Sequence, residues 1–167
     1  MLIGPPGAGK STFADELVRC ATVHPGAVIL SDAIAAELFE RHRPNDDGVI
    51  FGDRDRRVIA RLQQGQVAIA DSTNVRPEAR QRLIRLAREA SVPVSALRFS
   101  VSLQTLRAQD AARERHVADI ERYHELMVRT CTPAGLRAEG FAYVVDVPGA
   151  EAGLSVSPNT EKPLGVR

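Results

Sequence analysis

The residues with the clearest chemical meaning lie close to the start of the chain. Residues 4–12 read GPPGAGKST and fit the pattern G-x-x-x-x-G-K-[ST] of a phosphate-binding P-loop, also called Walker A. Glycines let such a backbone turn its N–H groups toward phosphate oxygens, at φ and ψ values that a side chain would block. The loop runs into a helix, whose N-terminus carries about half a positive charge and free N–H donors. The pattern predicts a nucleotide site rather than a simple Gly/Pro turn before a helix.

Side-chain chemistry gives the residues of this loop different roles. Lys10 is predicted to reach the β- and γ-phosphates of a nucleotide, and the Ser11 hydroxyl is predicted to ligate Mg²⁺. We therefore expect ATP and Mg²⁺ as cofactors. The residues expected to bind the nucleotide are Gly4, Pro5, Pro6, Gly7, Ala8, Gly9, Lys10, Ser11 and Thr12.

Two acidic residues follow short apolar runs further along the chain. Asp32 comes just after residues 27–30 (AVIL), and Asp71 comes directly after residues 67–70 (VAIA). Wholly apolar runs of this length are typical of parallel strands that are covered on both faces. Ligands of open parallel sheets bind at the carboxyl ends of the strands. The sequence therefore predicts that both acids lie at the same edge as the P-loop.

Each of these acids has a catalytic and a purely local interpretation. Asp32 can face the γ-phosphate and accept a hydroxyl proton, as the catalytic carboxylate of kinases does. Alternatively, Ser31 or Asp32 only caps the helix that follows. Asp71 can hold Mg²⁺ directly or through water. Alternatively, it takes part only in the turn chemistry of residues 71–74 (DSTN).

Arginines between two predicted helices are the last candidates for the site. A mobile segment that carries Arg113 and Arg115 can fold over the phosphates and neutralise charge in the transition state. The alternative is a solvated, charged junction. Cys20 and Cys131 have no paired spacing, which predicts reduced thiols in a cytoplasmic protein without a disulfide partner.

Length and composition limit the remaining possibilities. The chain has 167 residues and a net charge of +1, so it is long enough for one domain and has no strong field for a polyanion. No apolar run approaches the roughly 18 residues of a membrane span, and we expect no membrane partner. Only three residues precede the P-loop, so either the first strand is a stub or the true start lies upstream.

The pattern of apolar residues predicts an α/β domain over residues 1–147, with a parallel sheet and flanking helices. Residues 148–167 are rich in Pro, Gly and Ser and are predicted to be a flexible tail. Strands are expected at 27–30, 67–70, 93–99 and 141–145, and helices at 11–21, 33–41, 49–64, from Pro77 to about 90, 103–112 and 118–129.

Taken together, these motifs resemble the P-loop kinases that include polynucleotide 5′-hydroxyl kinases. The resemblance covers roughly residues 2–147. The P-loop is shared by many families, whereas the DSTN segment and the Arg-x-Arg-x-Val segment are more particular to this one. The matching segments are residues 4–12, 30–32 (LSD), 71–74 with Arg80, 113–117 (RERHV) and 139–141 (EGF).

The resemblance implies a P-loop NTPase fold of the nucleotide-kinase type, with about five parallel strands flanked by helices and an Arg-containing lid. It implies transfer of the ATP γ-phosphate to a hydroxyl, with a nucleic-acid 5′ end as acceptor. It makes Asp32 the general base, assigns phosphate and Mg²⁺ to Lys10 and Ser11, and makes Arg113 and Arg115 lid arginines.

Two departures from the family pattern leave the acceptor open. The family usually has an arginine three residues after the Asp32 position, and Ala35 stands there. The lid usually begins Arg-Asn, and residues 109–110 read Gln-Asp. Arg41, Arg43 or Arg54 could substitute for the missing arginine, or the acceptor could be a small molecule. A nucleotide-binding module without transfer activity is the third alternative.

Overall fold

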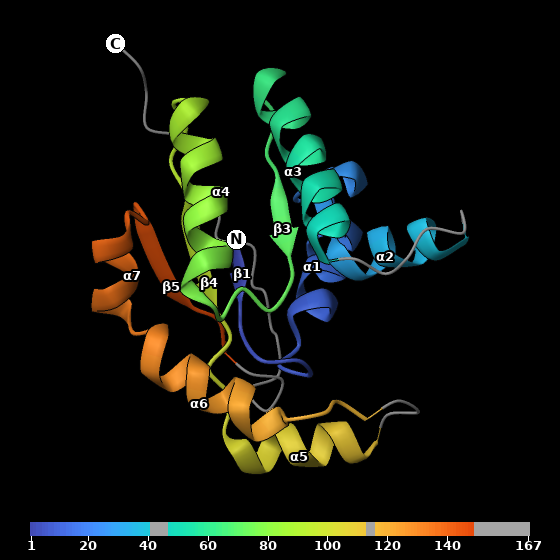
Figure 1. The fold of residues 1–167 in the computed structure, drawn as a ribbon, viewed down its shortest axis with the longest axis vertical. Helices are drawn as coiled ribbons and strands as arrows, with labels where there is room; N and C mark the ends of the chain where they lie inside the picture. Colours follow the sequence, from blue (N-terminus) through green and yellow to red (C-terminus); the bar gives the residue numbers. More distant parts are fainter. Residues whose placement is uncertain (41–46, 113–115, 149–167) are drawn as a thin grey trace.

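The computed structural model describes residues 1–40, 47–112 and 116–148 (Figure 1). Strands alternate with helices over most of this length, as the sequence predicts. The elements are β1 (Leu2–Ile3), α1 (Lys10–Arg19), the 3-10 turn η1 (Pro25–Ala27), β2 (Val28–Leu30), α2 (Ser31–Glu40), α3 (Asp47–Gln63), β3 (Ile69–Asp71), α4 (Pro77–Glu89), β4 (Ser95–Arg98), α5 (Leu103–Ala111), α6 (Ile120–Thr130), α7 (Pro133–Glu139) and β5 (Tyr143–Asp146).

The described strands are all parallel, but they form two hydrogen-bonded sets. One set has the order β1-β4-β5, and the other pairs β2 with β3. The expected single sheet of about five strands is therefore only partly formed, with three strands in the main set. Among the described residues β1 pairs with β4 and β2 pairs with β3, and no ladder joins β1 to β3. The two sets meet just beyond these strands, where the Gly4 amide donates a hydrogen bond to the Thr73 carbonyl at 2.9 Å.

Helices cover both faces of this sheet and bury its short central strand. The neighbouring residues Leu2 and Ile3 are both 0% exposed and belong to different apolar clusters. Leu2 lies with residues of α1 and α5, including Ala14 and Leu106. Ile3 lies with residues of α4, α6 and α7. Successive side chains of a strand point to opposite faces, so even this short β1 connects the two sides of the core.

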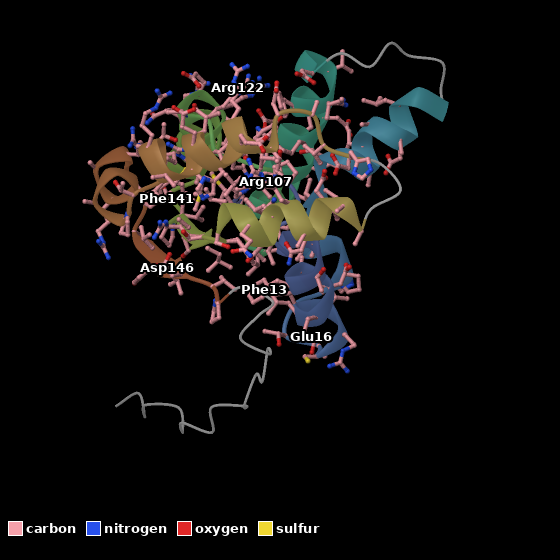
Figure 2. All side chains as sticks on the ribbon, turned by 90° about the horizontal axis from the view of Figure 1, so that it is seen from below. Phe13, Glu16, Arg107, Arg122, Phe141 and Asp146 are labelled. Atoms are coloured by element: carbon pink, nitrogen blue, oxygen red, sulfur yellow. The ribbon has the colours of Figure 1, made fainter. Side chains whose placement is uncertain are left out.

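Two helices lie across the end of the sheet toward which the β3 arrow points (Figure 1). These are α5 and α6, which lie side by side when the molecule is viewed from below (Figure 2). Arg107 of α5 forms an ion pair with Glu121 of α6 at 2.8 Å. The Phe13 ring of α1 meets Phe99 edge-on, with 5.5 Å between ring centroids. Helices therefore flank the carboxyl edge of the sheet, where the P-loop lies.

Some element boundaries differ from those expected. Helix α2 begins at Ser31, directly after β2, so Asp32 lies in its first turn and is not an N-cap. Helix α3 begins at Asp47, whereas the sequence pattern predicts its start at residue 49. Helix α7 was not predicted at all, although its signals are present. The Thr132 hydroxyl caps its start by accepting a hydrogen bond from the Gly135 amide, and Gly140 ends it at φ 113°.

Arg80 is the most connected buried side chain of the described chain, and it is 0% exposed. Its Nε and Nη2 atoms donate to the two Glu139 carboxylate oxygens at 2.7 and 2.5 Å. Further donated bonds reach the carbonyls of Asn74, Val75 and Thr130 at 2.9–3.1 Å. One guanidinium group therefore ties α4, the segment after β3, α6 and α7 together. Arg80 and Glu139 therefore have a structural position in this fold.

The described helices include none with the length and apolarity needed to cross a membrane. Cys20 is exposed and Cys131 is buried, and both are free thiols.

Candidate functional site

The P-loop joins β1 to α1 at the carboxyl edge of the sheet. Gly7 and Gly9 have φ values of +83° and +88°, a region that residues with side chains rarely adopt. Gly9 is also the N-cap of α1 and makes no side-chain hydrogen bond to it, so an anion could bind the N–H groups of the first helical turn. At Gly4 a Cβ atom would lie 2.9 Å from the Phe99 Cβ, so only glycine fits there. These features match the expected phosphate cradle.

Lys10 lies beneath this loop and is only 7% exposed. Its Nζ atom donates hydrogen bonds to the carbonyls of Gly4 at 2.9 Å and Pro5 at 2.7 Å. The ammonium group is therefore held at the turn of the loop. Phosphate oxygens of a bound nucleotide could replace the two carbonyls as its hydrogen-bond acceptors. The phosphate-binding role of Lys10 stays a prediction.

Asp71 connects the P-loop to the sheet. The Ser11 hydroxyl donates a hydrogen bond to the Asp71 Oδ2 atom at 2.8 Å. Burial raises the pKa of the Asp71 carboxyl, and the charges of Asp32 and Asp15 raise it further, whereas the Ser11 hydrogen bond and the Lys10 charge lower it. These five residues therefore share one electrostatic environment. The sequence did not mark Asp15 as part of the site, because it occupies what looks like an ordinary polar position on the outer face of α1.

The Ser11 and Asp71 side chains fit a magnesium ion that arrives with a nucleotide. Mg²⁺ prefers oxygen ligands and usually takes one or two carboxylates, with waters and phosphate oxygens completing the shell. Over the described ranges, no group of three or more His, Cys, Asp or Glu residues forms a metal cage. The raised pKa of Asp71 indicates that its charged form is poorly solvated. A cation at this place would stabilise that charged form.

Asp32 lies at the same edge, on the neighbouring strand connection. Strands β2 and β3 are paired with Leu30 opposite Asp71, and Asp32 follows Leu30 by two residues. The Asp32 side chain is exposed, so an acceptor hydroxyl can reach its carboxylate. The structure thus brings the P-loop, Asp71 and Asp32 together, as predicted from three separate places in the sequence.

Asn74, the last residue of the DSTN segment, has a structural position. It is 1% exposed with φ +48°, and its side-chain amide donates to the Leu2 carbonyl at 2.8 Å. This bond connects the segment after β3 to β1 at the point where the two sets of strands meet. The motif therefore combines a site residue, Asp71, with a residue that fixes the P-loop strand in place.

The arginines considered for the lid and for the acceptor phosphate are not gathered at this site in the described part of the chain. Arg113, Arg115, Arg41 and Arg43 lie outside the described residues. Arg54 is 1% exposed, donates to the Asp55 carboxylate at 2.8 Å and lies over the Phe51 ring at 4.9 Å. These contacts favour a structural role for Arg54 within the helix packing. Ala35 is half-buried against the apolar cluster between α2 and α3, and its methyl group offers no charge to an acceptor.

Similar solved structures agree with this fold. One is a provisionally assigned kinase from Chloroflexus aurantiacus j-10-fl, with a TM-score of 0.59 and 20% identity over 87% of this chain and 81% of that one. Another is a gluconokinase from Sinorhizobium meliloti 1021, with a TM-score of 0.55 and 16% identity over 87% of this chain and 79% of that one. At these identities the likeness concerns the fold alone.

A family model described as AAA_33, an AAA domain, matches residues 1–133. The match includes the P-loop, Asp32, Asp71 and the Asn74 contact that joins them to the sheet. Because it spans most of the chain and the fold is that of P-loop kinases, the protein belongs to this AAA domain family.

Proposed function

We propose that the protein is a kinase that transfers the γ-phosphate of ATP to a hydroxyl group. The observation that carries this proposal is the 2.8 Å hydrogen bond from Ser11 to Asp71, which joins the phosphate loop to the acidic edge of the sheet. Phosphoryl transfer depends on positioning and on charge stabilisation, with a carboxylate to receive the acceptor proton. The exposed Asp32 carboxylate supplies that last group, which a module that only binds nucleotides would not need.

Each residue has a distinct part in the proposed reaction. Backbone N–H groups of the P-loop and the Lys10 ammonium bind the β- and γ-phosphates. Ser11 and Asp71 would hold Mg²⁺, which would supply positive charge to offset that of the phosphates. The oxygen of the acceptor hydroxyl attacks the γ-phosphorus while Asp32 accepts the hydroxyl proton. The bond between the γ-phosphorus and the β,γ-bridging oxygen breaks, and ADP leaves. Asp32 then releases the proton to solvent.

The first prediction tests nucleotide binding. A ligand that binds only the native state stabilises it by about 2.7 kcal/mol at 100 times its Kd. We therefore expect ATP with Mg²⁺ to raise the Tm by several degrees. Lys10→Ala should remove most of this shift, because it deletes the buried ammonium group that is proposed to bind the phosphates. The measurement is a thermal melt with and without the ligand.

The control is Lys162→Ala, which removes the only other lysine of the sequence and should keep the full shift. An equal shift in the Lys10 variant would contradict the assignment of the P-loop as the phosphate site.

We propose two candidates for the acceptor that carries the hydroxyl group. The resemblance to polynucleotide kinases implies a 5′-hydroxyl nucleic-acid end. A neutral, sugar-like hydroxyl compound is the second candidate, and Ala35 favours it. A bidentate arginine would bind the phosphate beside a nucleic-acid hydroxyl, and Ala35 has no such group. A net charge of +1 also gives little attraction for a polyanion. One structural neighbour, the gluconokinase, is a small-molecule kinase by its name.

The second prediction separates these acceptors. We expect weak activity of the natural protein on a 5′-hydroxyl oligonucleotide and higher activity after Ala35→Arg, which restores a cation for the acceptor phosphate. Transfer to a sugar-like alcohol should not increase. The assay compares both acceptors across salt concentrations, because phosphate contacts weaken as salt rises.

Ala36→Arg is the matched control, since Ala36 is the next residue of α2 and is exposed. An equal gain from both variants would mean a general charge effect. Efficient phosphorylation by the natural protein would mean that another residue holds the acceptor phosphate, with Arg41 and Arg43 the first to replace.

A further inference from the structure

A hollow of about 580 Å³ lies along one face of α4, and none of the P-loop residues lines it. Its lining residues recur every three or four positions from Pro77 to Arg88, which is the spacing of neighbours on a helix surface. Three of them are arginines, Arg82, Arg85 and Arg88, whereas Glu78 is the one acidic residue of this lining. The excess of two positive charges makes the hollow a candidate site for an anion.

The three arginines are close neighbours without an acidic residue between them. Residues 82–88 read RLIRLAR, so each arginine follows the previous one by three positions. Like charges at this spacing repel each other and destabilise a helix. Arg85 and Arg88 are exposed, and neither forms an ion pair with another residue of the described chain. A bound anion would offset their repulsion.

Arg82 differs from the other two because the protein fixes its orientation. Its Nε atom donates a hydrogen bond to the Asp55 Oδ2 atom of α3, the helix that contacts α4 (Figure 1). The other carboxylate oxygen of Asp55, Oδ1, accepts hydrogen bonds from Arg54 at 2.8 and 3.1 Å. Arg54 is 1% exposed, so it holds Asp55 from the interior, and Asp55 in turn holds Arg82.

The contact with Asp55 leaves the other end of Arg82 available. The Arg82 side chain is 41% exposed, and its two terminal nitrogens make no hydrogen bond within the described residues. These nitrogens form a planar fork that matches the oxygens of a phosphate group. Because Asp55 carries one negative charge and contacts two guanidinium groups, it cannot neutralise both. An arginine that is already held in place also loses less side-chain freedom when it binds a ligand.

We propose that this hollow is a second phosphate-binding site, for a compact ligand with two or three linked phosphate groups. Six residues of helix separate Arg82 from Arg88, which is about 9 Å at 1.5 Å per residue, so successive phosphates can contact successive arginines. The volume of about 580 Å³ lies in the usual range of small-molecule sites. The lining residues include no aromatic side chain on which a base could stack, which favours a phosphate chain over a nucleic-acid strand. This site does not depend on the transfer reaction proposed above.

Calorimetric titration with inorganic triphosphate and Mg²⁺ at low salt tests the proposal, with the P-loop as an internal reference. We expect two bound equivalents in the natural protein and one in Lys10→Ala, which weakens the P-loop site. The double variant Arg85→Gln, Arg88→Gln should also bind one equivalent, because loss of two charged contacts weakens the second site by about 100-fold. Both arginines are exposed, so this variant should keep its Tm. A single equivalent in the natural protein that is lost in Lys10→Ala would overturn the proposal.

Further variants control for charge and for geometry. The double variant Arg122→Gln, Arg129→Gln removes the same charge from exposed positions of α6 and should keep both equivalents. Arg82→Lys keeps the charge but loses the fixed fork, and it should weaken the second site by about tenfold. Equal weakening in the α6 variant would mean a general charge effect and would overturn the proposal. An oligonucleotide without a terminal phosphate that binds this site more tightly than triphosphate would also overturn it, because the hollow would then be a nucleic-acid surface.

Discussion

Replacing Asp32 by asparagine is expected to lower kcat for phosphotransfer by about 10²–10⁴, the usual contribution of a general base. Asparagine keeps the size and one oxygen of the side chain but cannot accept a proton. Because Asp32 is exposed and is not the helix cap, the loss in stability should stay within about 1 kcal/mol, the scale of a charge at a helix N-terminus. ADP release under saturating ATP measures the rate, and a thermal melt with ATP measures binding.

Asp15→Asn is the matched control for this prediction. Asp15 is exposed, and its charge also acts on Asp71, but it lies on α1 and not at the end of β2. Its replacement should leave kcat nearly unchanged. If both variants lost the same activity, Asp32 would act through the electrostatics of Asp71 rather than as a base. Full turnover by Asp32→Asn would exclude the catalytic role.

Arg80→Met is expected to destabilise the fold by about 3–5 kcal/mol, the usual effect of breaking a buried ion pair by removing one partner. The substitution would leave the Glu139 carboxylate largely buried without its guanidinium group. It would also remove the donors to the carbonyls of Val75 and Thr130. For a protein of this size each kcal/mol lowers the Tm by about 2–4 °C, so a thermal melt should show a fall of about 6–20 °C.

Two further variants test the cause of this loss. Arg85→Met lies on the same helix at an exposed position and should change stability by no more than about 0.5 kcal/mol. Adding Glu139→Gln to Arg80→Met should recover part of the loss, because it removes the unpaired charge. A single Arg80 variant that melts like the natural protein would show that the network contributes little.

Much of the site was predictable because its parts depend on local sequence or on a general rule of sheets. The P-loop geometry follows from glycines whose spacing is visible in the chain. The meeting of Asp32 and Asp71 follows from parallel strands, whose carboxyl ends share one edge. The register that places Leu30 opposite Asp71 could not be predicted, since it is set by contacts between segments that are far apart in the sequence.

Other features depend on contacts between distant parts of the chain. The resemblance singles out Arg80 and residues 139–141, but the sequence does not show that Arg80 and Glu139, 59 residues apart, form an ion pair. The division of the strands into two sets depends on which strands pair, and the sequence pattern does not show this. Helix α7 is short and has a weak apolar pattern, so its capping residues were its only signal.

The resting contacts of Lys10 have a consequence for which nucleotides the loop distinguishes. Its ammonium group already has the Gly4 and Pro5 carbonyls as acceptors, so a ligand must compete with the protein's own backbone for these donors. Charged phosphate oxygens at the β and γ positions accept more strongly than neutral carbonyls, whereas adenosine or AMP offers nothing at those positions. We therefore expect selection by the number of phosphates before any selection by base. ADP, which has one phosphate fewer, would dissociate as the Lys10 ammonium returns to the Gly4 and Pro5 carbonyls.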